Sequence, residues 1–240
     1  ITKNIIETEI YGKPKTVHLA LIGHGNVGGT LVEQILDSAY DILKRKRVDL
    51  KIVAIANSKK IAFNQAGFGS DWRQKIKFSQ TESSVEKLVE FAKEHHLENL
   101  VMVDNTASKD FVKHYPTFVE NGFDVVGSNK IYNTLPISEY RDFRKLLEKN
   151  KKKYLYETNV GAGLPLIDTI KLLHLSGENI TRIKGVFSGT LSYVFNNFSL
   201  RNDKFSTIIN EALEKGFTEP DPREDLSGND VARKLLILAR

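Results

Sequence analysis

The chain has 240 residues, of which 40% are hydrophobic and 27% are charged, a balance typical of a globular protein with one large domain or two modest ones. It contains no cysteine, which excludes a disulfide framework, a thiolate metal site and a cysteine nucleophile. The net charge of +5 comes largely from scattered lysines and from basic runs after expected helices, a placement that favours solvated helix ends over a nucleic-acid surface.

Strands and helices are expected to alternate along residues 1–156, because short apolar runs are separated by amphipathic runs with a period near 3.6. The expected strands are 17–22, 50–56, 100–104, 123–126 and 153–156. The first expected helix follows the glycine turn and includes Val27, the later ones cover 84–96, 109–121 and 136–150, and 57–82 are expected to be irregular. Val27 and Leu31 are expected on the buried face of the first helix. This alternation predicts an α/β fold with a Rossmann-type, doubly wound parallel sheet.

The pattern becomes less regular after residue 156. The expected helices there are 164–175, 191–199, 205–215 and 229–240, and a strand is expected at 180–187. We therefore expect two domains, residues 1–156 and residues 157–240, the second of a partial α+β type.

The glycine pattern Gly23-x-Gly25-x-x-Gly28 lies between the first expected strand and the first expected helix, the context that dinucleotide binding requires. Gly23 allows a tight turn, Gly25 lets the backbone approach a pyrophosphate, and Gly28 allows close packing of helix and strand. Asn26 and Val27 begin the helix, whose first N–H groups can bind phosphate. A glycine-rich turn without a ligand is the alternative, but the strand–turn–helix context favours a dinucleotide-binding domain.

The end of the second expected strand bears on the choice of cofactor. An NAD site usually has an acidic residue there, which accepts a hydrogen bond from the ribose 2′-hydroxyl. This chain instead has Asn57 and Ser58 followed by Lys59 and Lys60, whose positive charges suit a 2′-phosphate. NADP is therefore favoured, whereas lysines that are merely solvated would leave NAD open.

Polar residues also follow the third and fourth expected strands, at the sheet edge where ligands of such folds bind. Asn105 and Thr106 have small side chains that suit contact with the ribose or the nicotinamide, or else they cap the next helix. Lys130 follows the next strand, either as a surface charge or as a cation that reaches into the crevice.

Asp230 and Lys234 lie four residues apart on the last expected helix, so their side chains are expected to pair. Apolar residues flank the pair, and Arg233 and Arg240 are expected on the solvated side. A lysine that an aspartate orients at the margin of an apolar face is a candidate proton donor or acceptor. The alternative is an exposed ion pair worth under ~1 kcal/mol.

Three stretches together resemble the homoserine dehydrogenase family. They are GAGLP at 161–165, FSGTLSY at 187–193, and GFTEPDPREDLSGNDVARK at 216–234. The similarity extends from the glycine pattern to the last residue and is closest to the dehydrogenase part of the bifunctional aspartokinase–homoserine dehydrogenases. It implies that residues 157–240 form a substrate-binding, catalytic and dimerisation domain and that the protein is a homodimer.

The resemblance implies NAD(P)-dependent interconversion of L-homoserine and L-aspartate 4-semialdehyde in threonine and methionine biosynthesis. By the same match, Lys234 and Lys130 matter for proton transfer, and Asp230 and Asp225 hold the substrate and the lysines. Glu219 would bind the ammonium group of the amino acid. The implied substrate-binding residues are thus Glu219, Asp225 and, in the same segment, Gly216.

A monovalent cation, sodium, is also implied by the resemblance. Its ligands would be the carboxylate of Glu157 and the backbone carbonyls of Val160, Ala162 and Leu164.

Two features depart from the family pattern. Many members have a second lysine where this chain has Ile131, so only Lys130 of that pair remains. Family chains also continue beyond the last helix here, with strands that complete the substrate domain. We therefore expect an intact cofactor crevice, an incomplete second domain and turnover below that of a full-length member.

Two alternatives stay open: another Rossmann oxidoreductase of an amino-acid alcohol or aldehyde, and a non-catalytic dinucleotide-binding module. Aspartate-semialdehyde dehydrogenase, which uses the same aldehyde, is excluded because its chemistry needs a cysteine nucleophile. The expected partners are a small-molecule substrate and a second copy of the chain, with no nucleic acid and no membrane. No apolar run is long enough to cross a bilayer and no signal peptide is visible, so we expect a cytoplasmic protein.

Overall fold

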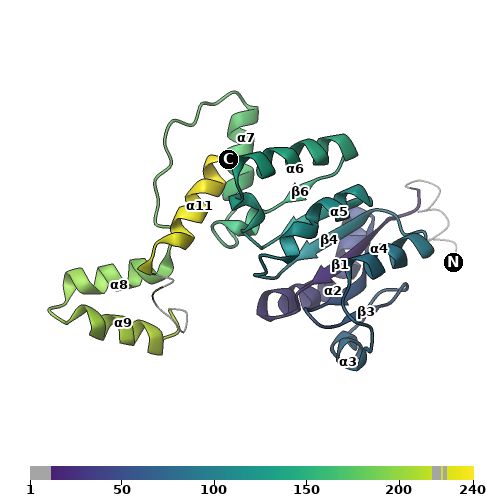
Figure 1. Ribbon diagram of the computed structural model, residues 1–240, viewed down its shortest axis with the longest axis horizontal. Helices are drawn as coiled ribbons and strands as arrows, with labels where there is room; N and C mark the ends of the chain where they lie inside the picture. Colours follow the sequence, from purple (N-terminus) through teal and green to yellow (C-terminus); the bar gives the residue numbers. More distant parts are fainter. Residues whose placement is uncertain (1–11, 218–222, 224–225) are drawn as a thin grey trace. The chain divides into compact units, whose positions relative to one another are not determined.

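The computed structural model describes residues 12–217, 223 and 226–240, and the chain divides into two compact units. The first unit contains the residues up to Tyr132 together with Pro136–Leu155. The second unit contains Asn133–Leu135 and Tyr156–Arg240. Figure 1 shows a sheet with surrounding helices in the first unit, whereas the labelled elements of the second unit are helices.

The first unit is built on a mostly parallel six-stranded sheet with the strand order β3-β2-β1-β4-β5-β6. The strands are β1 (Lys15–Ile22), β2 (Val48–Ala56), β3 (Ile61–Phe63), β4 (Leu100–Asp104), β5 (Phe123–Gly127) and β6 (Tyr154–Leu155). Only β3 pairs antiparallel, with β2. The strand order reverses direction at β1, between β2 and β4, which is where ligands of doubly wound sheets bind. The expected Rossmann-type fold is confirmed.

The helices of the first unit follow the expected order. They are α2 (Asn26–Lys46), α3 (Trp72–Phe78), α4 (Val85–Glu94), η1 (Phe111–His114), α5 (Tyr115–Glu120), η2 (Tyr132–Thr134, which ends in the second unit) and α6 (Ile137–Asn150).

Two expectations about these elements are wrong. Residues 57–82 are not irregular, because they contain β3 and α3, which are too short for hydrophobic periodicity to reveal. The helix expected over 109–121 is instead a 3₁₀ turn followed by α5. Pro116 lies in the first turn of α5, where its missing N–H costs nothing, whereas a continuous helix would need that N–H as a donor.

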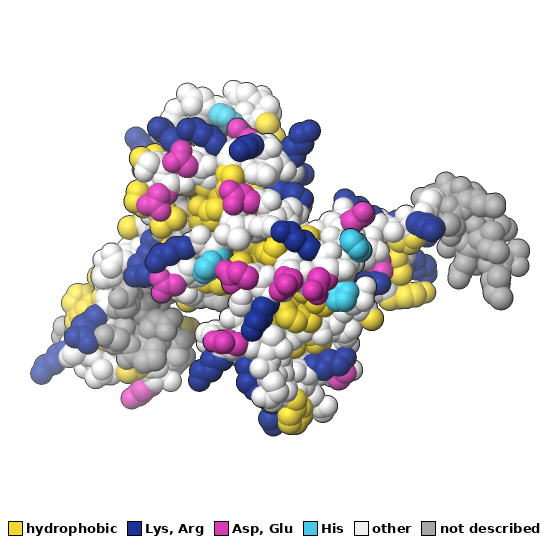
Figure 2. Space-filling view, turned by 45° about the vertical axis from the view of Figure 1, so that its right-hand side comes forward, with side chains coloured by type: hydrophobic (Ala, Val, Ile, Leu, Met, Phe, Trp, Pro, Cys, Tyr) yellow, Lys and Arg dark blue, Asp and Glu magenta, His cyan; other side chains and the backbone are white. Residues whose placement is uncertain are grey.

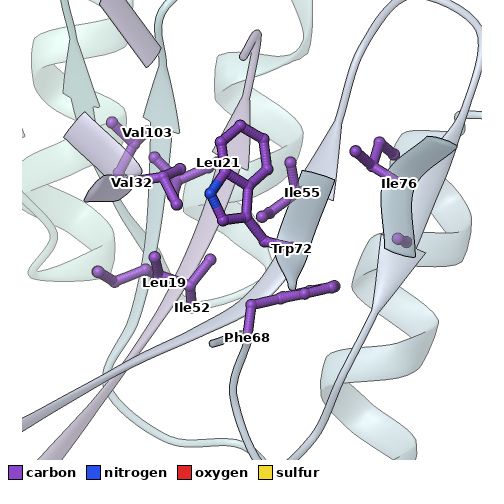
Figure 3. Packing of buried hydrophobic residues seen from close by; sticks show 10 residues of the cluster. Leu19, Leu21, Val32, Ile52, Ile55, Phe68, Trp72, Ile76 and Val103 are labelled. Carbon is purple, nitrogen blue, oxygen red and sulfur yellow. The ribbon is translucent and has the colours of Figure 1, made fainter. Parts of the chain in front are cut away.

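A core cluster joins the sheet to α2 and α3, and it includes Leu19, Leu21, Val32, Ile52, Ile55, Phe68, Trp72, Ile76 and Val103. Figure 3 shows the indole ring of Trp72 beside Leu21 and Ile55. Trp72 is only 1% exposed, so its burial removes a large apolar surface from water. Leu31 packs against this cluster as expected. Val27 is instead 61% exposed, because the first turn of α2 lies beyond the cluster.

The regular elements of the second unit, in the part that the structure describes, are helices. They are η3 (Glu157–Asn159), α7 (Leu166–Leu175), α8 (Gly189–Leu200), α9 (Phe205–Glu214) and α11 (Asn229–Ala239). The strand expected at 180–187 is wrong: these residues have no regular secondary structure, and Val186 is 78% exposed. An apolar run becomes a strand only where a partner strand satisfies its backbone, and none of the described residues supplies one.

The core of the second unit is small. Helices α8 and α9 pack through Val194, Ile208, Ile209 and Ala212, with Tyr193 and Leu226 at the margin. Arg201, which follows α8, donates two hydrogen bonds to Glu211 on α9, of 2.7 and 2.8 Å. Among the residues that can be described, no helix combines the length and apolar character needed to cross a membrane.

Candidate functional site

The glycine turn between β1 and α2 is tightly packed at two of its three glycines. Gly23 has a φ of +84°, and a Cβ atom added to it would lie 2.9 Å from the Cγ2 atom of Thr106. A Cβ atom on Gly28 would lie 1.9 Å from the carbonyl oxygen of Gly23. Gly25 differs, because nothing lies within 4 Å of its added Cβ atom. The turn therefore leaves space at the glycine where a pyrophosphate approaches the backbone most closely.

The N-terminus of α2 lies at this turn without a side-chain cap. Gly25 is the N-cap residue, and the first turn of the helix contains no acidic residue. Asn26 and Val27 are exposed there. The backbone N–H groups of this turn and the positive end of the helix dipole make the position suitable for a phosphate group.

Asn57 organises the turn that follows β2. Its Oδ1 atom accepts hydrogen bonds from the backbone N–H groups of Lys59 at 2.8 Å and Lys60 at 2.9 Å. Its Nδ2 atom lies 3.0 Å from Nε2 of His24, which links this turn to the glycine turn. Ser58 is exposed. Asn57 thus shapes the turn, and the two lysines project from it.

A cavity of about 390 Å³ lies between this turn and helix α3. Four cationic side chains and no carboxylate line it, and the cations are Lys59, Lys60, Arg73 and Lys77. His24 and Trp72 add ring surface to the same lining. A positively charged cavity with aromatic walls, at the end of β2, suits a phosphorylated nucleoside.

Glu33 on α2 binds two residues of α3 that line this cavity, Trp72 and Arg73. Its carboxylate accepts a hydrogen bond from Nε1 of Trp72 at 2.9 Å and forms an ion pair with Arg73. These two donors, Trp72 first, hold the pKa of Glu33 below its usual value. The guanidinium of Arg73 also lies 4.4 Å from the centroid of the Trp72 ring. Arg73 is therefore oriented before any ligand binds.

Trp72, Arg73 and Lys77 are binding candidates that the sequence motifs did not indicate. All three belong to α3, inside the stretch that was expected to be irregular. A usable signal was present, because the only tryptophan of the chain stands among Arg73, Lys75 and Lys77. What periodicity could not show is that α3 folds back to the end of β2.

Asn105 lies where the ends of β4 and β1 meet. Its backbone N–H donates to the carbonyl oxygen of Ile22 at 2.8 Å. Its Nδ2 atom is buried and has no hydrogen-bond partner among the described residues. Leaving a buried donor unsatisfied costs about 1–3 kcal/mol, which an acceptor on a bound ligand would offset. This orphaned amide fits a dinucleotide laid along the glycine turn.

Asn105 and Thr106 do not cap the next helix. The N-cap residue of η1 is Asp110, and the Oγ atom of Ser108 accepts from the backbone N–H of Phe111 at 3.1 Å. Thr106 Oγ1 instead accepts from the N–H of Ser108 at 3.2 Å. The side chains of residues 105 and 106 therefore remain candidates for cofactor contact.

Asp104, the last residue of β4, is completely buried and accepts three hydrogen bonds. Its Oδ1 atom accepts from the N–H of Thr106 at 2.7 Å. Its Oδ2 atom accepts from the hydroxyl of Tyr115 at 2.7 Å and from Nδ2 of Asn129 at 3.1 Å. Burial raises the pKa of Asp104, although its hydrogen-bond donors oppose that rise.

Lys130 is half-buried in the loop that follows β5. Ser128, two residues before Lys130, donates its N–H to the carbonyl oxygen of Asp104 at 2.9 Å, so this loop is bonded to the end of β4. Because β2, β1, β4 and β5 are consecutive in the sheet, the residues after them lie along one edge. The first unit thus brings the glycine turn, Asn57, Asn105 and Lys130 together.

In the second unit, the expected ion pair between Asp230 and Lys234 forms. Nζ of Lys234 lies 2.6 Å from Oδ2 of Asp230 and donates to the carbonyl oxygen of Phe187 at 2.7 Å. The side chain of Lys234 is 21% exposed and that of Asp230 is 44% exposed. The ammonium is therefore held by two acceptors from different segments.

Arg240 does not lie on a solvated side of α11, contrary to expectation. Its Nη1 atom donates to the carbonyl oxygens of Asn133 at 2.8 Å and Leu135 at 2.9 Å. The helix ends against residues 133–135, a contact between distant parts of the sequence that helical projection cannot show.

Only part of the expected substrate-binding set is described. Gly216 has a φ of +70° and follows α9, where Phe217 donates its N–H to the carbonyl oxygen of Ala212 at 2.8 Å. This glycine therefore ends the helix in a Schellman motif. Glu219 and Asp225 lie outside the described residues.

Glu157, the expected cation ligand, caps helix α7. Its Oε1 and Oε2 atoms accept from the backbone N–H groups of Ile167 and Asp168, both at 2.8 Å. The backbone then turns through positive φ values at Gly161 and Ala162. Val160 is buried and Leu164 is 62% exposed. No group of three or more His, Asp or Glu side chains gathers as a metal site in the described ranges.

The sheet, its strand order and the glycine turn define a Rossmann-type dinucleotide-binding protein with a second, helical unit. Residues 23–157 match the family described as "Homoserine dehydrogenase, NAD binding domain", and residues 165–240 match the family described as "Homoserine dehydrogenase". The chain therefore belongs to the homoserine dehydrogenase family, as its sequence motifs indicate.

Relatives of known name share this assignment. Over 98% of its length the chain is 42% identical to bifunctional aspartokinase/homoserine dehydrogenase 1, chloroplastic, of Arabidopsis thaliana. Over 98% it is 44% identical to the bifunctional aspartokinase/homoserine dehydrogenase of Buchnera aphidicola. It spans 26% and 29% of these two relatives. A hyperthermophilic archaeal homoserine dehydrogenase, solved in complex with NADPH, is similar with a TM-score of 0.75 and 25% identity, over 93% of this chain and 68% of that one.

Proposed function

We propose that this chain carries homoserine dehydrogenase activity and interconverts L-homoserine and L-aspartate 4-semialdehyde with a nicotinamide cofactor. The observation that carries the proposal is the ammonium of Lys234, which Asp230 and the carbonyl oxygen of Phe187 hold in place. A non-catalytic dinucleotide-binding module would need the glycine turn but would have no need of this oriented amine.

The chemistry assigns a role to each of these groups. A bound nicotinamide supplies or accepts the hydride. Reduction of the aldehyde leaves an alkoxide, which needs a nearby proton donor, and oxidation of the alcohol needs a base. Lys234 serves as that donor and base, with Asp230 orienting it. Lys130, in the loop after β5, is proposed to contact the bound cofactor and to take part in proton transfer. Glu219 and Asp225, outside the described residues, are proposed to bind the substrate.

NADP is the proposed cofactor, with NAD as the alternative. The cavity after β2 has four cationic side chains and no carboxylate, so it lacks the acid that would accept from a ribose 2′-hydroxyl. A guanidinium is suited to bind phosphate through two parallel hydrogen bonds, and Arg73 is held at the cavity by Glu33 and Trp72. We assign the 2′-phosphate to Arg73 together with Lys59 and Lys60.

A sodium ion is proposed at the loop that follows η3. Hard monovalent cations prefer oxygen ligands, and this segment contains the carboxylate of Glu157 and the backbone carbonyls of nearby residues in the sequence. The carbonyls of Val160, Ala162 and Leu164 would complete the set. Each oxygen of Glu157 accepts one N–H and keeps a further lone pair, so capping α7 does not prevent cation binding.

The remaining proposals concern organisation. Residues 1–156 are proposed as the dinucleotide-binding domain and 157–240 as the substrate-binding and catalytic domain. A homodimer and a cytoplasmic location stay predictions. On the face in Figure 2, Lys and Arg side chains are interspersed with Asp and Glu and do not form one continuous basic patch.

The test combines cofactor binding with turnover. NADPH binding is followed by nicotinamide fluorescence, and oxidation of L-homoserine by NADP⁺ is followed by absorbance, with threonine and malate as competing substrates. We expect NADPH binding and selective oxidation of homoserine. Lys234→Ala should abolish oxidation and leave NADPH affinity nearly unchanged.

The exposed Lys204→Ala is the matched control, and it should behave as the wild type. Persistent turnover by the Lys234→Ala variant would show that Lys234 is not the proton donor. Equal oxidation of threonine or malate would favour a different oxidoreductase, and NADPH binding without any turnover would favour the non-catalytic module.

A further inference from the structure

We propose that Asp104 is the positioning residue for Lys130, and that it acts by fixing the chain on both sides of that lysine. The inference rests on the proposed function, in which Lys130 faces the cofactor. Asp104 acts through Asn129 on one side of the lysine and through Tyr115 and Tyr132 on the other.

The first link runs through Asn129, which is 3% exposed. Its Nδ2 atom donates to Oδ2 of Asp104 at 3.1 Å and to the carbonyl oxygen of Ser108 at 3.1 Å. Its Oδ1 atom accepts from the backbone N–H of Ile131 at 3.1 Å. The side chain of Asn129 therefore spans Lys130 and holds the backbone immediately after it.

The second link runs through two stacked rings. The hydroxyl of Tyr115 donates to Oδ2 of Asp104 at 2.7 Å, which fixes the ring of this fully buried tyrosine. The ring of Tyr132 stacks on it with centroids 5.0 Å apart and an interplanar angle of 3°. The ring of Phe143 also packs against the ring of Tyr132, with centroids 4.3 Å apart. The chain two residues after Lys130 is therefore also anchored to Asp104.

The chemistry of the carboxylate explains why an aspartate is needed. All three of its partners are donors, namely the N–H of Thr106, the hydroxyl of Tyr115 and the amide of Asn129. An asparagine has only one acceptor oxygen, so it cannot accept from both the N–H of Thr106 and the amide of Asn129, and its NH₂ group would face one of these donors. At least one bond of the network would be lost while the side-chain volume stays the same.

The first test is a double-mutant cycle on NADPH affinity. We expect Asp104→Asn to weaken NADPH binding about tenfold, within the range of coupling inside one hydrogen-bond network. If Asp104 acts through Lys130, the Asp104→Asn, Lys130→Ala double variant should bind NADPH no more weakly than Lys130→Ala alone. Effects that multiply in the double variant would overturn the proposal, because Asp104 would then act independently of the lysine.

A polarity swap supplies the rescue. Asn129→Asp alone places two carboxylates face to face and should weaken NADPH binding at least as much as Asp104→Asn. Combining the two substitutions lets the new amide at 104 donate to the new carboxylate at 129, which can still accept from Ile131. We expect partial recovery of affinity, since the bond to Ser108 is lost. A double variant no better than either single variant would contradict the Asn129 link.

A ligand-free measurement separates this proposal from the proposed function. Asp104→Asn should speed amide hydrogen exchange at Ile131 in the absence of cofactor. The matched control is Asp124→Asn on β5, whose Oδ1 atom also accepts a backbone N–H, from Lys153 at 2.7 Å. This control should leave exchange at Ile131 and NADPH affinity unchanged.

The two failures look different. Absence of NADPH binding by the wild-type chain would contradict the proposed function. Amide hydrogen exchange at Ile131 would still decide whether Asp104 orders the segment around Lys130. Unchanged exchange at Ile131 in Asp104→Asn would remove the positioning role even where NADPH binds normally.

Discussion

The two units of this chain bury their apolar side chains to very different extents. In the first unit, a sheet covered by helices encloses Trp72, Tyr115, Phe118 and Phe123, each at most 1% exposed. In the second, large apolar side chains remain open to solvent, including Leu175 at 81%, Val186 at 78% and Leu200 at 86% exposed. A parallel sheet demands cover on both faces, whereas separate helices bury only what their neighbours reach.

This difference extends to the candidate site residues of each unit. In the first unit these residues depend on backbone geometry at the sheet edge, through the glycine turn, the turn at Asn57 and the Asp104 network. In the described residues of the second unit they depend on side-chain contacts such as that of Lys234 with Phe187. We infer that the candidate residues of the first unit are ordered before ligands bind and that those of the second unit are more sensitive to their surroundings.

The largest effect is expected from removing core volume in the first unit. Trp72→Ala should lower the free energy of unfolding by about 3–5 kcal/mol, because the residue is fully buried. Leu200→Ala in the second unit should change it by less than about 0.5 kcal/mol, because that side chain is exposed. Urea unfolding of both variants checks the contrast, and equal losses would show that the units do not differ as described.

The next effect separates two glycines of the same turn. Gly28→Ala should cost about 1–3 kcal/mol of stability and most NADPH binding, because its Cβ atom would strike the carbonyl oxygen of Gly23. Gly25→Ala should leave stability nearly unchanged, because its Cβ atom meets open space, and should weaken NADPH binding alone. Thermal unfolding and fluorescence titration read the two effects separately. Unchanged affinity in Gly25→Ala would argue against a pyrophosphate at this turn.

A smaller effect is expected on cofactor choice. Arg73→Ala should weaken NADPH binding about tenfold and leave NADH binding nearly unchanged, since only NADPH carries the 2′-phosphate. Lys75→Ala is the matched control, because Lys75 lies on the same helix but pairs with Asp71 at 2.9 Å outside the cavity. Isothermal titration with both cofactors decides the point. Equal losses of affinity for NADPH and NADH would show that Arg73 does not bind the 2′-phosphate.

The smallest expected effect is a pH dependence of stability from Asp104. Burial raises its folded-state pKa above the unfolded value, so the folded chain binds this proton more tightly than the unfolded chain does. Its contribution to stability is therefore fully present below the unfolded pKa and is lost as pH rises through the folded pKa. The wild type should gain stability relative to Asp104→Asn as pH falls through that window. A difference in unfolding free energy that stays constant with pH would contradict the raised pKa.

Features that depend on local order along the chain could be predicted from the residues alone. Alternating apolar runs predicted the sheet, the glycine spacing predicted the turn between β1 and α2, and a four-residue separation predicted the ion pair of Asp230 and Lys234. Each follows from the period of a strand or a helix, or from the steric freedom of glycine, so neighbouring residues suffice to reveal it.

Contacts between residues far apart in the chain could be known only from the fold. It placed α3 and Arg73 beside the turn after β2, joined Asp104 to Tyr115 and Asn129, and drew Arg240 onto residues 133–135. It also left 180–187 without the strand that their composition suggested. A short apolar run or a single charged residue takes its conformation and role from the surface packed against it, and a periodic pattern carries no information about that surface.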